Sequence, residues 1–375
     1  MKSTLVVCIC SLLLFGACRP RGGEQEGQAG GTPVLLRHAK GFRLVEADGY
    51  TMLTVLNPWK EGEVYARYYL VEDETKEVPS DGLKVKVPLQ TLVANSATQL
   101  EFLQMLGVID RVTGVCRVQY IYNPVVRQRV REGAVVDLGD AFNLDIERLL
   151  LLHPQAVMTT AYNVEDENAK RMRRTGLSLL YNIEWQERTL LGRAEWIKFV
   201  GAFFGKKAEA DSLFRLVEQE YESCRRLAED CEVRPSVMAG QDFRGAWYMP
   251  AGDSFNARLF GEAGADYLYA GDATSGSLSL TIEQALLQFR DADVWVGVQA
   301  NTLDELGRAD EKYKLFKAYR EGRVYNYNRR TTPEGGNDYW ESAVARPDRL
   351  LKDMIKVMHP ELLPGYELFY MQRLP

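Results

Sequence analysis

The residues of this sequence best suited to chemistry are aromatic and arginine side chains that follow short apolar runs. Trp247 follows the run at 236–240, and Arg329 and Arg330 follow the run at 324–327. Aromatic faces and guanidinium groups together hold large, flat and often anionic molecules, through stacking and paired hydrogen bonds. The candidate ligand-binding residues are Tyr120, Tyr122, Tyr162, Arg244, Trp247, Arg329, Arg330, Tyr339 and Trp340. The sequence therefore predicts a binding site for such a molecule.

The groups that catalysis or metal binding would need are not brought together by the sequence. The only three histidines, His38, His153 and His359, are scattered along the chain. Metal centres rich in histidine are therefore not expected. The GxSxG, HExxH, Walker A and GxGxxG motifs do not occur. We therefore expect no catalytic residues, no metal site and no resident cofactor. We also expect that the protein is not an enzyme.

Length and composition fit a body with two lobes and a small-molecule partner. The chain has 375 residues, of which 46% are hydrophobic and 26% charged, and its formal net charge is −6. A chain of this length can build two cores. Binding to nucleic acid or to an anionic membrane surface needs a basic excess, which this chain lacks. We therefore expect no nucleic-acid partner, and we expect a monomer.

The N-terminal residues predict export and a lipid anchor. The apolar run at 5–15 is roughly half as long as a membrane-spanning helix needs, which is typical of a signal peptide, here residues 1–17. The sequence Leu14 to Cys18 resembles a bacterial lipobox, so Cys18 is the expected lipidation site. Residues 18–32 are rich in Gly, Gln and Glu and predict a flexible tether. We expect a periplasmic protein held by lipid alone, in the cell membrane or the outer membrane.

Apolar patterning divides the rest of the chain into two α/β lobes joined by helices. Residues 33–187 are the first lobe, in which strands dominate up to residue 90 and then alternate with helices, as in parallel βα units. Residues 188–231 hold helix formers without a strand, and residues 232–375 resume the βα alternation. The β-rich extension at 33–87 either extends the sheet of the first lobe, which we favour, or forms a separate cap.

A short internal repeat supports two related lobes. Residues 144–147 (LDIE) match residues 280–283 (LTIE), and each copy runs on into a predicted strand. Glu147 and Glu283 fall in the first turn of a helix, where the helix dipole favours a carboxylate. Upstream of each copy a helix ends in the glycine expected just beyond a helix C-terminus. These glycines are Gly107 and Gly264.

Several stretches of the chain carry a family resemblance. They are Leu106 to Val115 (LGVIDRVTGV), Ile146 to Leu150 with His153 to Val157, the helical region 194–220, Arg346 to Asp348 and Pro360 to Leu362. In these stretches the chain resembles the substrate-binding proteins of bacterial iron-complex and cobalamin ABC importers. The resemblance implies the class III architecture, in which two Rossmann-like lobes are joined by a long rigid helix.

The resemblance also implies a function. It implies a lipoprotein that captures an iron complex (siderophore or haem) or cobalamin between its lobes and delivers it to an inner-membrane ABC permease. Glutamates of the repeat motif dock onto arginines of the membrane subunits in that family, and they correspond here to Glu147 and Glu283. The identity of the metal complex stays open. A chelatase-like enzyme on the same architecture and a lipoprotein with only an interaction role are the alternative functions.

Overall fold

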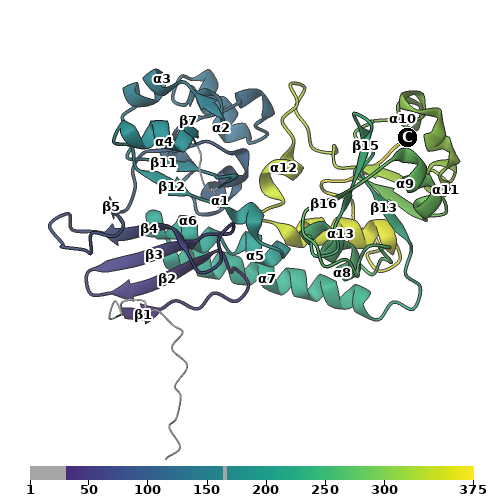
Figure 1. Cartoon of the computed structure of the whole chain (residues 1–375), viewed down its shortest axis with the longest axis horizontal. Coiled ribbons are helices and arrows are strands. Elements are labelled where there is room, and N and C mark those ends of the chain that lie inside the picture. The colour runs from purple at the N-terminus through teal and green to yellow at the C-terminus, as the bar shows by residue number, and fades with distance from the viewer. Residues whose placement is uncertain (1–30, 164–166) are drawn as a thin grey trace, which may run out of the picture.

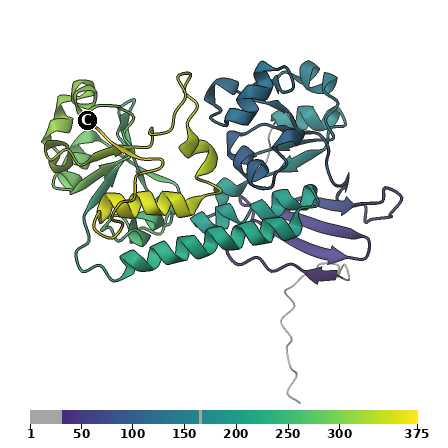
Figure 2. The same ribbon diagram turned by 180° about the vertical axis from the view of Figure 1, so that it is seen from behind.

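The computed structural model describes residues 31–163 and 167–375. Two α/β lobes stand side by side, a sheet lies below the first lobe, and a long helix runs beneath both (Figure 1, Figure 2). The predicted signal peptide and Cys18 lie outside the described residues, as does the tether up to residue 30. Its last two residues, Gly31 and Thr32, belong to strand β1 (Gly31–Pro33), so the first sheet begins within the segment predicted as tether. Within the described residues, no helix has the length and apolar character that a membrane crossing requires.

The N-terminal extension forms a five-stranded sheet of its own, which corrects the favoured prediction that it extends the sheet of the first lobe. The strand order is β1-β2-β3-β4-β5, and none of these strands is hydrogen-bonded to the sheet of the lobe. One face buries Phe42 and Tyr68 against Phe199 and Phe203 of the connecting helices, because alternate side chains of a strand point to the same side. The strands after β1 are β2 (Phe42–Ala47), β3 (Tyr50–Leu56), β4 (Val64–Val71) and β5 (Leu83–Lys86).

The first lobe is a parallel sheet with helices, as predicted. Its strand order is β12-β11-β6-β7-β8, and a small hairpin of β9 and β10 stands beside it. The strands are β6 (Leu92–Ala94), β7 (Val112–Val115), β8 (Val136–Asp137), β9 (Gly139–Asp140), β10 (Asn143–Leu144), β11 (Ala156–Thr159) and β12 (Leu179–Tyr181). The α-helices are α1 (Leu100–Met105), α2 (Pro124–Arg131), α3 (Ile146–Leu151) and α4 (Glu167–Arg174).

Three helices connect the lobes: α5 (Leu190–Ala194), α6 (Ile197–Phe203) and α7 (Lys207–Glu229). At 1.5 Å per residue, the 23 residues of α7 extend about 35 Å. Phe214 of α7 is buried in the core of the first lobe, whereas Tyr221 and Cys224 are buried in the core of the second. One uninterrupted helix therefore belongs to both cores, which confirms the predicted helical connection.

The second lobe pairs a mixed sheet with an antiparallel one. The larger sheet has the order β13-β17-β18-β19, and the smaller has the order β14-β15-β16. The strands are β13 (Val237–Ala239), β14 (Asp242–Phe243), β15 (Ala246–Pro250), β16 (Ser277–Leu280), β17 (Val294–Val296), β18 (Val324–Asn326) and β19 (Gln372–Arg373). The α-helices are α8 (Phe255–Glu262), α9 (Ile282–Phe289), α10 (Leu303–Ala309), α11 (Lys317–Arg320), α12 (Asp338–Ser342) and α13 (Pro347–Met358).

Residues 331–345 of the second lobe reach across to the first, and α12 stands between the two lobes in Figure 1. Arg127 of α2 forms an ion pair with Glu334, with Nη2 and Oε2 2.8 Å apart. Val344 and Ala345 are buried in the core of the first lobe. The lobes are thus joined both through α7 and through this crossing, an arrangement that restricts wide hinge motion.

Candidate ligand-binding site

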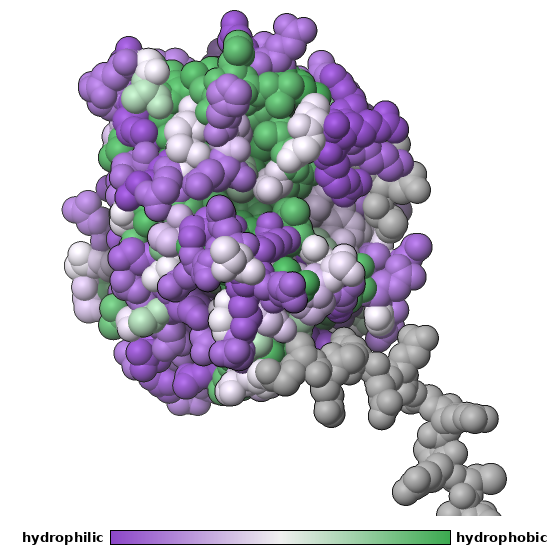
Figure 3. All heavy atoms as spheres, turned by 90° about the vertical axis from the view of Figure 1, so that its left-hand side faces the viewer, coloured by the Kyte–Doolittle hydropathy of each residue, from purple (hydrophilic) through white to green (hydrophobic). Residues whose placement is uncertain are grey.

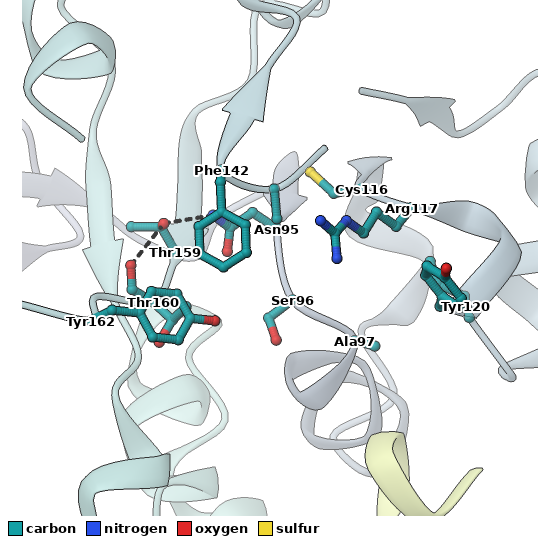
Figure 4. Close-up of a pocket in the computed structure, with 12 residues that line it drawn as sticks. Asn95, Ser96, Ala97, Cys116, Arg117, Tyr120, Phe142, Thr159, Thr160 and Tyr162 are labelled. Carbon is teal, nitrogen blue, oxygen red and sulfur yellow. Dashed lines mark hydrogen bonds between the residues drawn. The ribbon is translucent and has the colours of Figure 1, made fainter. Parts of the chain in front are cut away.

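A pocket opens at the carboxyl ends of β6, β7 and β11 in the first lobe (Figure 4). In open α/β sheets this edge is where ligands bind, because the loops that leave the strands diverge there. The pocket encloses about 220 Å³, less than the ~300–1,000 Å³ of a pocket that surrounds a drug-sized ligand. It is lined by Asn95, Ser96, Ala97, Cys116, Arg117, Tyr120, Ile121, Ala141, Phe142, Thr159, Thr160 and Tyr162. Only part of a large chelate fits into it.

Aromatic rings form one wall of this pocket. The ring centroids of Phe142 and Tyr162 are 5.2 Å apart, and those of Tyr162 and Trp185 are 5.5 Å apart. The indole N–H of Trp185 donates a hydrogen bond to Thr160 Oγ1 at 3.0 Å, which fixes the last ring of the series. Phe142 is 58% exposed and Tyr162 is 52% exposed. Two exposed rings backed by a fixed indole offer a stacking surface for a flat ligand.

Arg117 places a positive charge at the same wall. It follows β7 in the left-handed conformation with φ of 53°, and its guanidinium lies 5.7 Å from the centre of the Phe142 ring. Its Nε donates to Asp140 Oδ2 at 2.9 Å. This bond raises the pKa of Arg117 and lowers the pKa of Asp140, so both groups are charged at neutral pH. Asp140 thereby orients a guanidinium that can bind an anionic group of a ligand.

Neutral polar groups line the floor of the pocket. Asn95 Nδ2 donates to Thr159 Oγ1 at 2.7 Å, while Asn95 Oδ1 is buried without a hydrogen-bond partner. Burial raises the pKa of the Cys116 thiol to about 12. A thiol binds metal as the thiolate, so Cys116 is a poor metal ligand at neutral pH. Across the described residues, no group of three or more His, Cys, Asp or Glu side chains could hold a metal ion.

Of the predicted ligand-binding residues, Tyr120 and Tyr162 line the pocket. Tyr122 and Arg330 lie where the lobes meet, with the Arg330 guanidinium 5.1 Å from the centre of the Tyr122 ring. Arg330 also forms an ion pair with Asp338, with Nε and Oδ2 2.5 Å apart. The structure therefore brings four of the predicted side chains to the first-lobe pocket or to the lobe junction.

Two of the predicted ligand contacts are wrong in this structure, because the side chains are buried in the second lobe. Trp247 is 0% exposed, lies 5.5 Å from Trp295 in a stacked arrangement and donates from its indole to the carbonyl of Ala239 at 2.7 Å. Tyr339 is 8% exposed and stacks on Tyr327, with ring centroids 4.2 Å apart. Trp247 stands within strand β15 rather than in a loop, so the register of that strand turns its ring inward.

The last three predicted side chains lie in the second lobe, outside the lining of the first-lobe pocket. Arg244 occupies the turn between β14 and β15 with φ of 57°. Arg329 pairs with Glu367, with Nη2 and Oε2 3.3 Å apart. Trp340 is 66% exposed at the middle of α12, the helix that stands between the lobes, and its ring centroid lies 4.7 Å from that of Tyr339. Nothing in the structure connects these three residues with one another.

Sequence reasoning missed Asn95, Ser96, Arg117, Phe142 and Thr160. Four of them could have been found, because the short apolar runs at 91–94, 112–116 and 156–159 predict strands, and these residues follow them. Asn95 and Ser96 follow β6, Arg117 follows β7 and Thr160 follows β11. Phe142 carries no such signal. It stands in the tight turn between β9 and β10, a pair too short to be read from the sequence.

Buried carboxyl groups lie where the two lobes meet. Glu341 of α12 is 2% exposed, and its Oε2 accepts hydrogen bonds from the backbone N–H groups of Tyr122 at 2.8 Å and Asn123 at 3.3 Å. Burial raises the pKa of Glu341 to about 8. Burial, together with the charge of Asp338, raises the pKa of Glu101 to about 7. Both carboxyl groups at the contact between the lobes therefore hold their protons to a higher pH than an exposed glutamate does.

The two repeat glutamates are exposed at the first turns of equivalent helices. Glu147 is the second residue of α3, whose N-cap Asp145 accepts a hydrogen bond from the backbone of Arg148 at 3.0 Å. Glu283 is the second residue of α9 and pairs with Lys312, with Oε1 and Nζ 2.8 Å apart. The hydrogen bond from Lys312 lowers the pKa of Glu283.

A family model described as a periplasmic binding protein matches residues 92–331, well over half of the chain. The chain belongs to the periplasmic binding protein family. It is a periplasmic solute-binding protein of ABC-type transport. It is also 25% identical to an uncharacterized lipoprotein of Methanocaldococcus jannaschii, in an alignment that covers 88% of this chain and 83% of that relative. The family is extracytoplasmic, and the relative from Methanocaldococcus jannaschii is named a lipoprotein.

Solved structures of the same fold include proteins whose ligands are named. A periplasmic heme binding protein from Pseudomonas aeruginosa has a TM-score of 0.58 and 15% identity, with 76% of this chain and 98% of that chain covered. A periplasmic vitamin B12 binding protein of Vibrio cholerae has a TM-score of 0.53 and 13% identity, with 72% and 96% covered. At these identities the likeness concerns the fold, which is the predicted two-lobed class III architecture.

Proposed function

We propose that this periplasmic binding protein captures an iron complex, either a siderophore or haem, or cobalamin between its lobes and delivers it to an inner-membrane ABC permease. The observation that carries the proposal is the first-lobe pocket, where Arg117 and the rings of Phe142 and Tyr162 meet at one edge of the sheet. A flat anionic chelate can stack on the rings and pair with the guanidinium. The proposal involves no catalytic step, no resident cofactor and no metal held by the protein alone.

The size of the pocket supports a ligand shared between the lobes. A cavity of about 220 Å³ admits only one edge of a large chelate, so the remainder extends toward the second lobe. The second lobe offers amide groups at the carboxyl ends of its strands. Gln241 Oε1 accepts from the backbone of Gln299 at 2.8 Å, and Asn328 Nδ2 donates to Asn301 Oδ1 at 3.3 Å. Amides are suited to the carbonyl, amide and hydroxyl groups at the rim of such chelates.

A titration tests the ligand class. The chain without residues 1–17, carrying Cys18→Ser, is titrated with cyanocobalamin, haemin and a ferric siderophore, and tryptophan fluorescence and binding heat are followed. We expect one of the three to bind at micromolar concentration and to quench Trp185, which closes the aromatic wall. In Trp185→Phe the heat should persist while most of the quenching disappears. If none of the three ligands binds, the proposed ligand class is wrong.

The proposed delivery step uses Glu147 and Glu283 as contacts for basic side chains of the permease. An ion pair exposed to solvent contributes little free energy, so a cation of the permease can displace Lys312 from Glu283 at little cost. Glu147→Ala combined with Glu283→Ala should abolish transport in proteoliposomes, with ligand affinity and thermal stability close to the wild type. A loss of stability, with transport in proportion to the folded amount, would show that the glutamates serve only the helix starts.

The lipid anchor is proposed at Cys18, which would hold the body at the periplasmic face of a membrane. One cysteine that carries several acyl chains meets the requirement for stable anchoring. The relative named a lipoprotein supports this assignment. The proposal leaves open whether the cell membrane or the outer membrane holds the anchor.

A further inference from the structure

The two most exposed large apolar side chains of the described residues are leucines at matching positions in the two lobes. Leu287 of α9 is 85% exposed, and Leu151 of α3 is 78% exposed. Each leucine follows its repeat glutamate, Glu283 or Glu147, by four residues. Residues four apart are neighbours on one face of a helix. Each lobe therefore presents a carboxylate and a leucine together.

The two helices are equivalent elements of the fold as well as of the sequence. Helix α3 leads into β11, which pairs in parallel with β6, and helix α9 leads into β17, which pairs in parallel with β13. Both helices also begin with a side-chain N-cap, Asp145 in α3 and Thr281 in α9. The match of Leu151 with Leu287 is thus a match between corresponding points of two similar lobes.

Neither leucine is needed by the core of its lobe. Leu149 of α3 and Ala285 of α9, again matching positions, are both 0% exposed and hold the helices against the lobes. A single exposed leucine is ordinary on a protein surface. Here, in contrast, two exposed leucines lie at equivalent positions of the two lobes, and each lies beside an equivalent carboxylate. The same small surface element is therefore repeated in both lobes. In Figure 3 a large apolar area occupies the upper part of the first lobe, where α3 lies in Figure 1.

We infer that Leu151 and Leu287 are the apolar contacts of a docking face for one membrane partner that has two equivalent sites, each an apolar pocket beside a basic side chain. The inference rests on the proposed delivery to a permease, and it adds the residues that supply apolar contact area. A second copy of this chain does not fit as well, because either way of pairing the patches of two copies brings carboxylates together, and like charges across an interface repel. A partner built from two like subunits meets both patches at once. The carboxylates orient the approach, and the leucines slow dissociation.

The test measures binding of the full mature chain, with Cys18→Ser so that lipid plays no part, to an ABC permease of the iron-complex or cobalamin class in lipid nanodiscs. Leu151→Ser combined with Leu287→Ser should weaken binding about tenfold to a hundredfold, mainly through faster dissociation, since a buried leucine contributes roughly a factor of ten. Each single variant should show about half of the effect on a logarithmic scale. Melting temperature and ligand affinity should not change.

The matched control is Leu35→Ser combined with Leu216→Ser. These leucines are 74% and 63% exposed and have no such counterpart in the other lobe. They belong to segments at the bottom of Figure 1, near β1 and on α7, away from α3. The control pair should bind the permease like the wild type.

Three results would overturn the inference while leaving ligand capture intact. In the first, the variant at Leu151 and Leu287 binds the permease as tightly as the wild type. In the second, the control variant loses as much affinity for the permease as that variant does. In the third, the wild type binds equally well to nanodiscs of the same lipid that hold no permease. Dimers of the wild-type chain that disappear in the variant would assign the patch to self-association and would also refute it. If the wild type binds neither ligand nor permease, the proposed function itself fails.

Discussion

Glu341→Gln should make the protein more stable in alkaline solution, because it removes a carboxyl group that burial keeps from ionising. Glu341 is 2% exposed between the lobes, and burial raises its pKa from 4.5 to about 8. A raised pKa in the folded state means that the full stability is present below the unfolded pKa of 4.5 and is lost as the pH rises through 8. Glutamine keeps one oxygen to accept the backbone N–H groups of Tyr122 and Asn123.

The magnitude follows from the pKa of Glu341. One pKa unit corresponds to about 1.4 kcal/mol, so a rise from 4.5 to about 8 costs the wild type up to about 5 kcal/mol of unfolding free energy once the pH exceeds 8. At pH 5 the Glu341→Gln variant should therefore unfold within about 1 kcal/mol of the wild type. At pH 9 it should be more stable by several kcal/mol. Urea unfolding followed by circular dichroism at both pH values measures this difference.

Glu334→Gln is the matched control at the same junction, with the opposite sign. The ion pair with Arg127 lowers the pKa of Glu334, so its contribution is present above the unfolded pKa and is lost in acid. The Glu334 side chain is 53% exposed, so solvent screens the pair, and Glu334→Gln should change the free energy of unfolding only slightly. The reasoning about the junction is refuted if Glu341→Gln destabilises the protein equally at pH 5 and pH 9, because the carboxylate would then be charged and favourably paired.

Three further predictions address the site, the N-terminal sheet and the anchor. Arg117→Gln should weaken binding of the ligand identified by titration about tenfold to a hundredfold, which is the affinity that one charge-assisted hydrogen bond contributes. An unchanged dissociation constant would show that Arg117 is not part of the site. Glu195→Gln should lower the unfolding free energy by about 3–5 kcal/mol, because it removes a fully buried carboxylate. That carboxylate accepts hydrogen bonds from the backbone N–H groups of residues 37–39 and from Lys198. A change below about 0.5 kcal/mol in urea unfolding would contradict this prediction. Cys18→Ser should release the protein from membranes into the soluble fraction with ligand binding intact, and retention in the membrane pellet would place the anchor elsewhere.

Structural features formed by residues close together in the sequence were predicted well. Apolar periodicity in the sequence predicts a closing helix at 347–358, and α13 has the same bounds. The Asp48-Gly49 pair between two apolar runs predicts a hairpin, which is formed by β2 and β3. The two repeat glycines, Gly107 and Gly264, both adopt a positive φ, 69° and 76°, as expected of glycines just beyond a helix C-terminus. These features depend on residues within a few positions of one another, so the local sequence carries them.

The candidate site was predicted only in part. The residues after each strand were expected at the carboxyl edge of the sheet, which locates a loop but does not say which of its side chains enter the pocket. Tyr120 ends a short 3-10 helix after β7, Tyr162 lies in the loop after β11, and both reach the pocket. Trp247 was assigned to a loop after β13, yet the chain turns back at once and makes it a strand residue of β15. Inside a strand, a shift of one residue exchanges the two faces, and the partner strand fixes that register.

Local sequence patterns were enough to predict the alternation of strands and helices, the two lobes, the helical connection and the first-turn positions of Glu147 and Glu283. Packing between distant segments makes the N-terminal strands a separate sheet, buries Trp247 and sets Phe142 beside Arg117. The two groups of features differ in the distance along the chain over which they are set. Periodicity and capping are local, whereas the choice of a partner strand or a packing face depends on contacts between residues tens to hundreds of positions apart, as between Glu341 and Tyr122.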